Sequence, residues 1–409
     1  MGDNNLIRRR SFLRLSSTAA LAGIAGRIGY GQNPGGLQEV DELIRKVGTF
    51  PRRKLGYSGR EVSVMIGAGD MAPQLVEAGI ICGMNYWHKA NRWMSTGAPD
   101  IIVKNRDAHY CQVTVDRAGL DHYQGHFDEE EHYRFVKEAV LKTGLGYFDD
   151  MQLHYGYHNT SELKDDRSFI RAFERLKKEG LVKHLCLSQH SYEGSPRVKN
   201  GQSAAEILTA VIEDGLYEHA QFMYSYDGDT DLDKFMELAR SKSFGTIAMK
   251  TARGIGRMRQ DQSFMASLPE GTSPHNAMVR WLTTRTKLDA AVIRVRNMEE
   301  FVETYSGAGR ELRKEDQQVL DKMIAVADTT ACRLCGKCQS HCPQHIPITD
   351  ILRFERYAMD DHDWMRASSL YAGLPTKGDS CISCGTCIEH CPMHLRIPDK
   401  LAKAHILMS

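Results

Sequence analysis

Eight cysteines near the C-terminus fall into two copies of one pattern, C-x2-C-x2-C-x3-C-P. The first copy runs from Cys332 to Pro343 and the second, 49 positions later, from Cys381 to Pro392. In this spacing three thiolates reach three corners of one iron-sulfur cube, while the fourth ligates a second cube. Only three of the 11 cysteines lie elsewhere, whereas a disulfide framework would spread them differently. The pattern therefore predicts two [4Fe-4S] clusters.

Zinc is the other metal that paired cysteines hold, but zinc sites use four ligands and rarely need a third equally spaced cysteine followed by proline. The doubled run resembles the bacterial two-cluster ferredoxins, and the resemblance implies that each copy lends its last cysteine to the cluster of the other. The implied ligand sets are Cys332, Cys335, Cys338 and Cys391, and Cys381, Cys384, Cys387 and Cys342. His341 and His345 recur as His390 and His394, and packing or capping is expected of them rather than ligation. Two similar half-modules about a pseudo-twofold axis are predicted.

Length and composition describe an ordinary globular protein. The 409 residues leave room for two or three domains, with 42% apolar and 26% charged residues. The net charge of +1 creates no overall field for nucleic acid or an anionic membrane, so nucleic acid is not expected as a partner. No apolar run reaches 18 residues, which excludes a conventional membrane span.

The N-terminal segment, residues 1–32, carries a different signal. Arg9 and Arg10 are followed by Phe12 and Leu13 and then by a weakly apolar stretch, which resembles a twin-arginine export signal, although Arg14 replaces its usual lysine. The resemblance implies the twin-arginine export machinery as a partner and a periplasmic location. That route moves proteins already folded around their cofactors, which agrees with the predicted clusters. A disordered basic tail is the alternative.

Between residues 50 and 325, short apolar runs alternate with amphipathic helical stretches. The predicted strands are Val62–Ile66, Tyr147–Leu153, Val182–Leu187, Ala220–Tyr224, Thr246–Met249 and Ala290–Val295. Repeated β-α units predict a parallel sheet with right-handed crossovers, and about 275 residues fit a closed (β/α)8 TIM barrel. A doubly wound sheet is the alternative, but no G-x-G-x-x-G follows the first strand. The predicted domains are the signal at 1–32, the barrel at 33–325 and an α-rich cluster domain at 326–409.

Several motifs of this middle region resemble the aldo/keto reductases. They are RKLGYSG from Arg53, DMQLH from Asp150 and LKKEGLVKHLCLS from Leu176. IAMK, ending in Lys250, resembles the subset that carries a C-terminal ferredoxin module. The resemblance implies an oxidoreductase barrel with an Asp, Tyr, Lys and His tetrad, in which tyrosine donates a proton and a nicotinamide dinucleotide supplies hydride.

The tetrad itself matches poorly. Counting along the chain puts Met84 at the aspartate position and Lys89 at the tyrosine position, and only His154 falls where the family pattern expects it. Period-two alternation places Asp150, Gln152 and His154 on one face of their strand, and His154 lies at its C-terminal end, where barrel active sites lie. A histidine there can donate a hydrogen bond or shuttle a proton, although it could also be a satisfied structural histidine. The candidate catalytic residues are His154 and Tyr86, with Tyr110 as another phenol and His88, Lys89, Lys104 and Asp116 as sources of charge.

The family grips its dinucleotide with residues after the seventh strand and around the eighth. In this sequence the corresponding positions include basic residues, namely Lys250, Arg253, Arg294 and the nearby Arg296. These residues could neutralise a pyrophosphate or simply face solvent. The sequence therefore leaves open whether the barrel binds NAD(P)H. The function predicted is an iron-sulfur oxidoreductase that passes electrons between two [4Fe-4S] clusters and a small organic, carbonyl-type substrate, with a redox protein as partner. The alternative is a non-catalytic barrel that carries an electron-transfer module.

Overall fold

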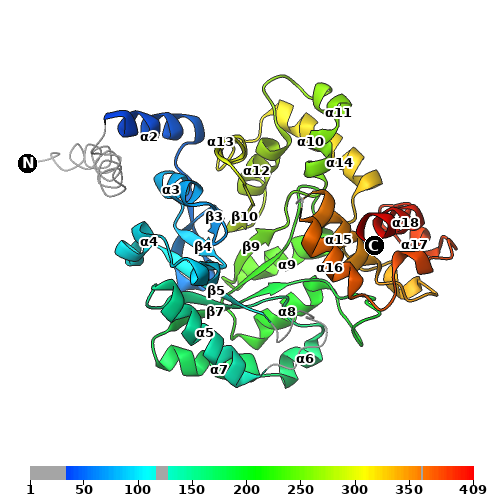
Figure 1. The fold of residues 1–409 in the computed structure, drawn as a ribbon, viewed down its shortest axis with the longest axis horizontal. Helices are drawn as coiled ribbons and strands as arrows, with labels where there is room; N and C mark the ends of the chain where they lie inside the picture. The colour runs from blue at the N-terminus through cyan, green and yellow to red at the C-terminus, as the bar shows by residue number, and fades with distance from the viewer. Residues whose placement is uncertain (1–33, 117–127, 361–362) are drawn as a thin grey trace, which may run out of the picture.

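The computed structural model describes residues 34–116, 128–360 and 363–409. A barrel of strands is ringed by helices, and a smaller helical domain, orange and red in Figure 1, lies beside it. The segment predicted to be an export signal, 1–32, lies outside the described residues. Among the described helices, none combines the length and the apolar character that crossing a membrane requires.

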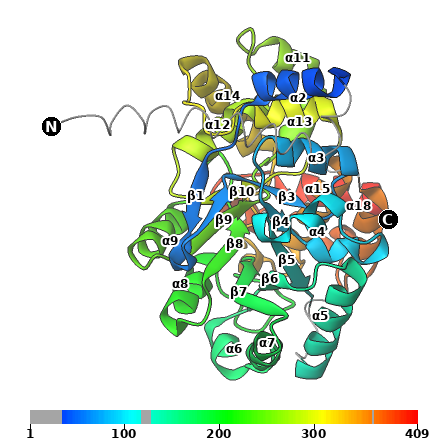
Figure 2. The ribbon, with the colours of Figure 1, turned by 90° about the vertical axis from the view of Figure 1, so that its left-hand side faces the viewer.

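Eight parallel strands close into a barrel in the order β10-β3-β4-β5-β6-β7-β8-β9 (Figure 2). The strands are β3 (Met65–Ala68), β4 (Tyr86–His88), β5 (Tyr110–Val115), β6 (Phe148–Leu153), β7 (Val182–Gln189), β8 (His219–Met223), β9 (Gly245–Met249) and β10 (Ala290–Val292). In the register of the sheet, Asp150 on β6 lies opposite Gln112 on β5 and His184 on β7. The predicted (β/α)8 barrel is confirmed.

Helices connect the strands over the outside of the barrel. They are α3 (Pro73–Ile81), η3 (Ala90–Ser95), α4 (Asp100–Lys104), η4 (Arg106–Ala108), α5 (Glu129–Thr143), α6 (Thr160–Asp165), α7 (Ser168–Lys178), α8 (Ala204–Asp214), α9 (Thr230–Ser241), α10 (Ile255–Gln260), α11 (Gln262–Ala266), α12 (Pro274–Thr284) and α13 (Met298–Tyr305), with α2 (Pro34–Val47) preceding the barrel. Local sequence sets their limits: α8 begins with a capping box between Ser203 and Glu206 and ends at Gly215, whose φ is 74°.

A two-stranded hairpin closes the N-terminal end of the barrel. Its antiparallel strands are β1 (Arg52–Leu55) and β2 (Arg60–Ser63), joined by η2 (Gly56–Ser58). Leu55 and Val62 pack against Ile247 at the start of the barrel. The turn needs glycine, since a Cβ on Gly56 would lie 2.6 Å from the amide nitrogen of Gly245.

The predicted strand Val62–Ile66 was wrong in its limits, because it spans the end of β2 and the start of β3. Between the two strands, the amide of Val64 donates to the carbonyl of Pro51 at 2.9 Å. This amide therefore takes no part in the hydrogen bonds between strands of the barrel. Every residue of the run is buried, so apolar character alone could not show that the chain changes sheets there.

The C-terminal domain repeats one backbone plan. Its elements are η5 (Gln339–His341), α15 (Ile348–Met359), α16 (Trp364–Ala372), η6 (Gly378–Ser380), α17 (Thr386–Glu389) and α18 (Ile397–Met408). Equivalent positions share a left-handed conformation: φ is 59° at Leu334 and 56° at Ser383, and the two halves meet where the rings of His341 and His390 stack, with centroids 3.4 Å apart. The two cysteine runs therefore form paired half-modules, and these histidines pack together.

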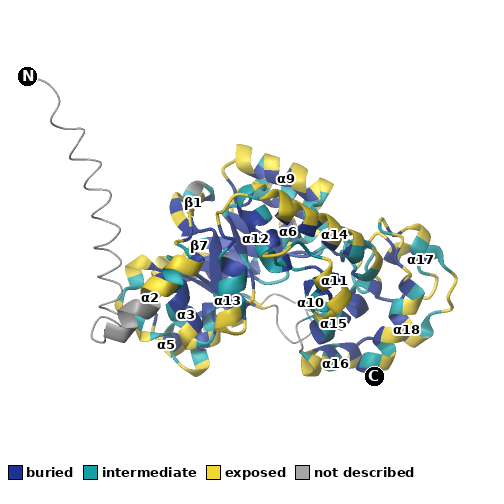
Figure 3. Ribbon diagram, turned by 90° about the horizontal axis from the view of Figure 1, so that it is seen from above, coloured by how far each residue is buried: buried dark blue, intermediate teal, exposed yellow. Residues whose placement is uncertain are grey.

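Helix α14 (Lys314–Thr330) leads from the barrel into this domain. Ala327 and Ala331 belong to the barrel core, and a separate core begins at Leu334. Figure 3 shows the two cores as separate dark-blue regions. The predicted domain limit at residues 325 and 326 thus falls inside α14, because the helix continues to pack on the barrel beyond that point.

Candidate functional site

The interior of the barrel holds a column of hydrogen-bonded polar side chains. Arg60, on the closing hairpin, forms a bidentate ion pair with Asp150 at 2.7 and 2.8 Å. Above this pair, Gln112 Nε2 donates to the Tyr86 hydroxyl at 3.1 Å, and its Oε1 accepts from His88 Nδ1 at 2.6 Å. His88 ends β4 at the mouth of the barrel. The column therefore connects the closed end of the barrel to its open end.

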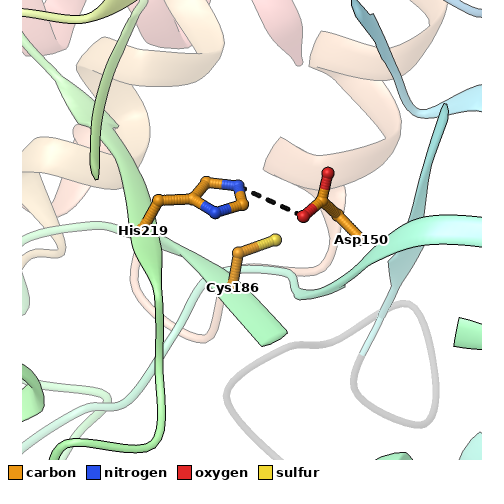
Figure 4. Close-up of side chains that lie close together, drawn as sticks. All are labelled: Asp150, Cys186 and His219. Atoms are coloured by element: carbon orange, nitrogen blue, oxygen red, sulfur yellow. Dashed lines mark ion pairs between the residues drawn. The ribbon is translucent and has the colours of Figure 1, made fainter. Parts of the chain in front are cut away.

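Asp150, Cys186 and His219 lie together in the middle of this column (Figure 4), with potential ligand atoms within 4.8 Å of one another. Burial would raise the pKa of Asp150, but the ion pair with Arg60 lowers it to about 2. Burial lowers the pKa of His219 to about 4 and raises that of Cys186 well above its ordinary value, so both stay neutral. Since Arg60 already neutralises the only charged ligand, this cluster serves the barrel interior and does not suit a metal ion.

Three side chains at the C-terminal end of the barrel form a chain of hydrogen bonds. His154, which follows β6, donates from Nδ1 to the carboxylate of Asp116, which follows β5. Lys89, which follows β4, lies with Nζ 3.2 Å from His154 Nε2. A carboxylate only accepts, so the proton of His154 is on Nδ1, and Nε2 accepts from Lys89. The imidazole thus links the lysine to the carboxylate.

The environment sets the protonation of these groups. Burial lowers the pKa of His154 to about 4, and the charge of Lys89 adds to the effect. Burial also lowers the pKa of Lys89 to about 8. At neutral pH, His154 is therefore neutral and Lys89 is protonated. The lowered pKa of Lys89 makes the release of its proton easier. A lysine in this state can act as a general acid.

Strained backbone marks the same place. Lys89, Tyr155 and Lys250 are not glycines, yet their φ values are 51°, 67° and 54°. All three line one cavity at the barrel mouth. Left-handed conformations of such residues are unfavourable and tend to gather at functional sites.

The cavity has a volume of about 590 Å³, within the usual range for sites that bind small molecules. His88, Lys89 and His154 form part of its floor, and Lys250 and Arg294 lie on its barrel side. The C-terminal domain supplies part of the wall through Arg356, Tyr357, Asp360, Asp363 and Arg366. A larger hollow, of about 1280 Å³, lies between α3, η3 and α4, away from this chain of hydrogen bonds.

The structure separates the candidate catalytic residues. His154 lies in the cavity, with Lys89 and Asp116 as its neighbours. Tyr86 points into the barrel interior, fully buried and outside the lining of the cavity, so it does not fit the catalytic role predicted for it. Tyr110 begins β5 at the closed end. Lys104 is exposed on α4, where it pairs with Asp100.

The predicted dinucleotide-binding residues lie in two different places. Lys250 and Arg294 line the cavity. Arg253 does not: it is 2% exposed and pairs with Asp227 and Asp328, and it donates to the carbonyl of Ala331 at the end of α14. Arg253 therefore fixes the junction between the domains, and its predicted contact with a cofactor is corrected. Sequence reasoning missed this role because α14 lies far along the chain.

The cysteines come together in the two exchanged sets that the ferredoxin resemblance implies. Cys342 lines a small pocket with Cys381, Cys384 and Cys387, which we call the outer set. In the other set, burial raises the pKa of Cys338, and so do the nearby thiols of its own set, Cys332, Cys335 and Cys391, and, least, that of Cys387 in the outer set. We call these four cysteines the inner set. Four convergent thiols in each set are the donors that a [4Fe-4S] cluster requires.

The inner set adjoins the barrel. Cys332 lines a small pocket together with Lys250 and Arg356, which both also line the mouth cavity. The carbonyl of Cys335 accepts a hydrogen bond from Ser191, on the barrel side, at 2.8 Å. The outer set lies away from the barrel, with Cys384 exposed. Lys250 and Arg356 therefore border both the mouth cavity and the pocket that Cys332 lines.

Comparison with known proteins identifies the second region. Residues 324–392 match the family model of the 4Fe-4S dicluster domain, which confirms the two predicted clusters. An aldo-keto reductase from Bacillus halodurans in its holo form is similar at 15% identity and a TM-score of 0.48, over 67% of this chain and 96% of that one. An aldo-keto reductase from Pseudomonas aeruginosa gives 15% identity and 0.47, over 64% and 97%. No curated protein matches the chain.

Proposed function

We propose that this chain is an iron-sulfur oxidoreductase that reduces a small carbonyl compound in the barrel mouth. The observation that carries this proposal is the wall formed by Lys250 and Arg356, which lines both the mouth cavity and the pocket of Cys332. A substrate in the cavity would therefore lie against residues that also border the pocket of Cys332. A (β/α)8 barrel joined to a dicluster domain supports a redox function of this kind.

The proposal assigns the redox role of a dinucleotide to the dicluster domain. The stretch after β9, where the aldo/keto reductase resemblance places dinucleotide contacts, is covered by α15. Arg356 donates to the carbonyl of Lys250 at 3.2 Å, and Arg257 pairs with Asp360 at 3.0 Å. A Cβ on Gly256 would lie 2.9 Å from the Cα of Asp360. NAD(P)H would have to displace these contacts to bind as the resemblance suggests.

The residues of the mouth fit proton delivery to a carbonyl oxygen. Reduction of a carbonyl to an alcohol takes two electrons and two protons, and two bound [4Fe-4S] clusters together exchange two electrons. Lys89 is placed to donate one proton from Nζ, and the cavity is open to water, which supplies the second. His154 holds Lys89 in position through Nε2, and Asp116 fixes the tautomer of His154. Lys89 thus replaces the proton-donating tyrosine of the family pattern.

The outer set offers an approach for an external redox protein. Cys384 is exposed, and the neighbouring Ile382 is 61% exposed. An exposed apolar side chain beside a cluster ligand is suited to a transient electron-transfer contact. Export by the twin-arginine route, with a periplasmic location, is proposed only on the basis of residues 1–32.

An anaerobic titration tests the electron source. The holoprotein is titrated with NADH, NADPH and dithionite while cluster reduction is followed by EPR. We expect reduction by dithionite and none by either nicotinamide. Rapid reduction by NADH or NADPH would contradict the proposal. The alternative, a non-catalytic scaffold, predicts that clusters reduced by dithionite stay reduced with every carbonyl compound offered.

A further inference from the structure

The mouth cavity carries an excess of positive charge. Of the residues that the structure describes, eight lysines and arginines line it, against four carboxylates. The basic residues are Lys89, Arg92, Lys250, Arg259, Arg294, Arg296, Arg356 and Arg366, and the acidic ones are Asp70, Glu300, Asp360 and Asp363. Since the chain as a whole has a net charge of only +1, this excess is a local property of the cavity.

The four carboxylates of the cavity already have partners. Asp70 pairs with Arg92, and Glu300 pairs with Arg296. Asp360 pairs with Arg257, and Asp363 caps α16 by accepting from the backbone of Arg366. Asp70, Glu300 and Asp360 are therefore paired with arginines, whereas Asp363 also acts on the Arg366 side chain and offsets part of its charge.

Two of the basic side chains face each other across the domain junction. Lys250 comes from the barrel and Arg366 from α16 of the dicluster domain. Both lie against the ring of Tyr357: the centroid is 4.3 Å from Arg366 Cζ and 5.7 Å from Lys250 Nζ. Tyr357 thus contacts both Lys250 and Arg366, and its uncharged ring does not neutralise either of them.

These two cations line the same cavity as the proposed proton donor, Lys89. The charge of Lys250 acts on His154, and the charge of Arg366 acts on Lys89. Lys89, His154, Lys250 and Arg366 all line the same cavity of about 590 Å³, so a single ligand in it is exposed to all of these groups. Arginine and lysine across a domain junction are well suited to a carboxylate or a phosphate.

We propose that the cavity binds a small aldehyde or ketone that carries an anionic group, held between Lys250 and Arg366 with its carbonyl oxygen at Lys89. This inference rests on the proposed function and adds its substrate class. It also gives the dicluster domain a second task, because Arg366 makes this domain half of the substrate site. The anionic group is a carboxylate or a phosphate, and the test separates them.

Calorimetry on the oxidised holoprotein tests binding without turnover. The probes are pyruvate, glycolaldehyde phosphate and the neutral ester methyl pyruvate. We expect pyruvate or glycolaldehyde phosphate to bind at least about ten-fold more tightly than the ester, and more weakly at high salt. The tighter of the two anions identifies the anionic group. Equal affinity for ester and anions, or no binding of either anion, would overturn the inference.

Variants locate the binding. Arg366→Gln and Lys250→Gln are each expected to weaken the anion by about ten-fold, because each removes a charge-assisted contact. Arg134→Gln, at an exposed arginine of α5, is the control and should bind like the parent. Unchanged affinity in both cavity variants would overturn the inference. Anion binding without any cluster reoxidation would support it while contradicting the proposed function, so the two failures are distinguishable.

Discussion

The inner and outer cysteine sets share a sequence pattern and a backbone but differ in their surroundings. Cys338 and Cys391 of the inner set are buried, and the carbonyl of Cys335 bonds to the barrel. In the outer set Cys384 is exposed, beside an exposed Ile382. A repeated motif therefore provides two chemically similar clusters, while the packing of the domain gives each a different neighbour: the barrel mouth on one side and solvent on the other.

Paired cysteine variants should separate the two sets most strongly. Cys338→Ser and Cys384→Ser each remove one ligand, so iron content should fall from about eight toward about four atoms per chain. Cys338→Ser should lower the melting temperature further than Cys384→Ser does, because Cys338 is also packed in the domain core. Iron analysis and thermal unfolding under anaerobic conditions measure both effects. Equal melting temperatures in the two variants would contradict the assigned environments.

Lys89→Met tests the barrel side of the comparison. Without the proton donor, reoxidation of the reduced clusters by a carbonyl substrate should slow by about 100-fold or more. Stopped-flow absorbance of the clusters gives the rate, and the spectra themselves should not change. Lys104→Met is the matched control, since Lys104 is an exposed lysine away from the cavity. A rate within about two-fold of the parent would remove Lys89 from the proton-donor role.

Arg253→Gln tests the junction that places the inner set at the barrel. It should lower the free energy of unfolding by about 1–3 kcal/mol, because it leaves the carbonyls of Ala327 and Ala331 without their donor, while Asp227 keeps its ion pair with Arg333. Denaturant titration of the holoprotein measures the loss. Arg285→Gln, in an exposed pair with Glu311, should change it by less than about 1 kcal/mol. Similar losses in both variants would show that Arg253 does not anchor the junction.

The pH dependence of carbonyl reduction gives a smaller effect. The pKa of Lys89 is lowered to about 8 by burial, so the protonated acid is present below that pH and is lost above it. The rate should therefore fall by about ten-fold for each pH unit above 8. In Lys89→Arg, whose side chain stays protonated, the descending limb should disappear. A rate that rises above pH 8 in the parent would contradict the assignment.

Sequence patterns predicted most reliably what depends on short spacing. The cysteine runs gave the cluster domain, and the runs around Phe148 and Val182 gave strands β6 and β7. The position of His154 after the apolar run put it at the end of β6, where it lines the cavity. Each of these features is set by residues a few positions apart, so the local sequence contains enough information.

Features that depend on packing between distant segments were not predictable. Tyr86 and Lys89 are three residues apart, and only the closed barrel shows that one points inward and the other lines the mouth. Arg253 forms an ion pair with Asp328, which lies 75 residues further along the chain. Arg366 reaches the cavity only because α16 docks on the barrel. Such roles follow from tertiary contacts that no periodicity encodes.

A single-turnover experiment tests the central claim most directly. Holoprotein reduced stoichiometrically with dithionite is mixed anaerobically with a panel of small carbonyl compounds, and cluster oxidation and alcohol are measured together. The account predicts that an anionic carbonyl compound reoxidises both clusters and yields one alcohol for every two electrons. Clusters that stay reduced with every compound, or that reoxidise without alcohol, would contradict a catalytic barrel mouth.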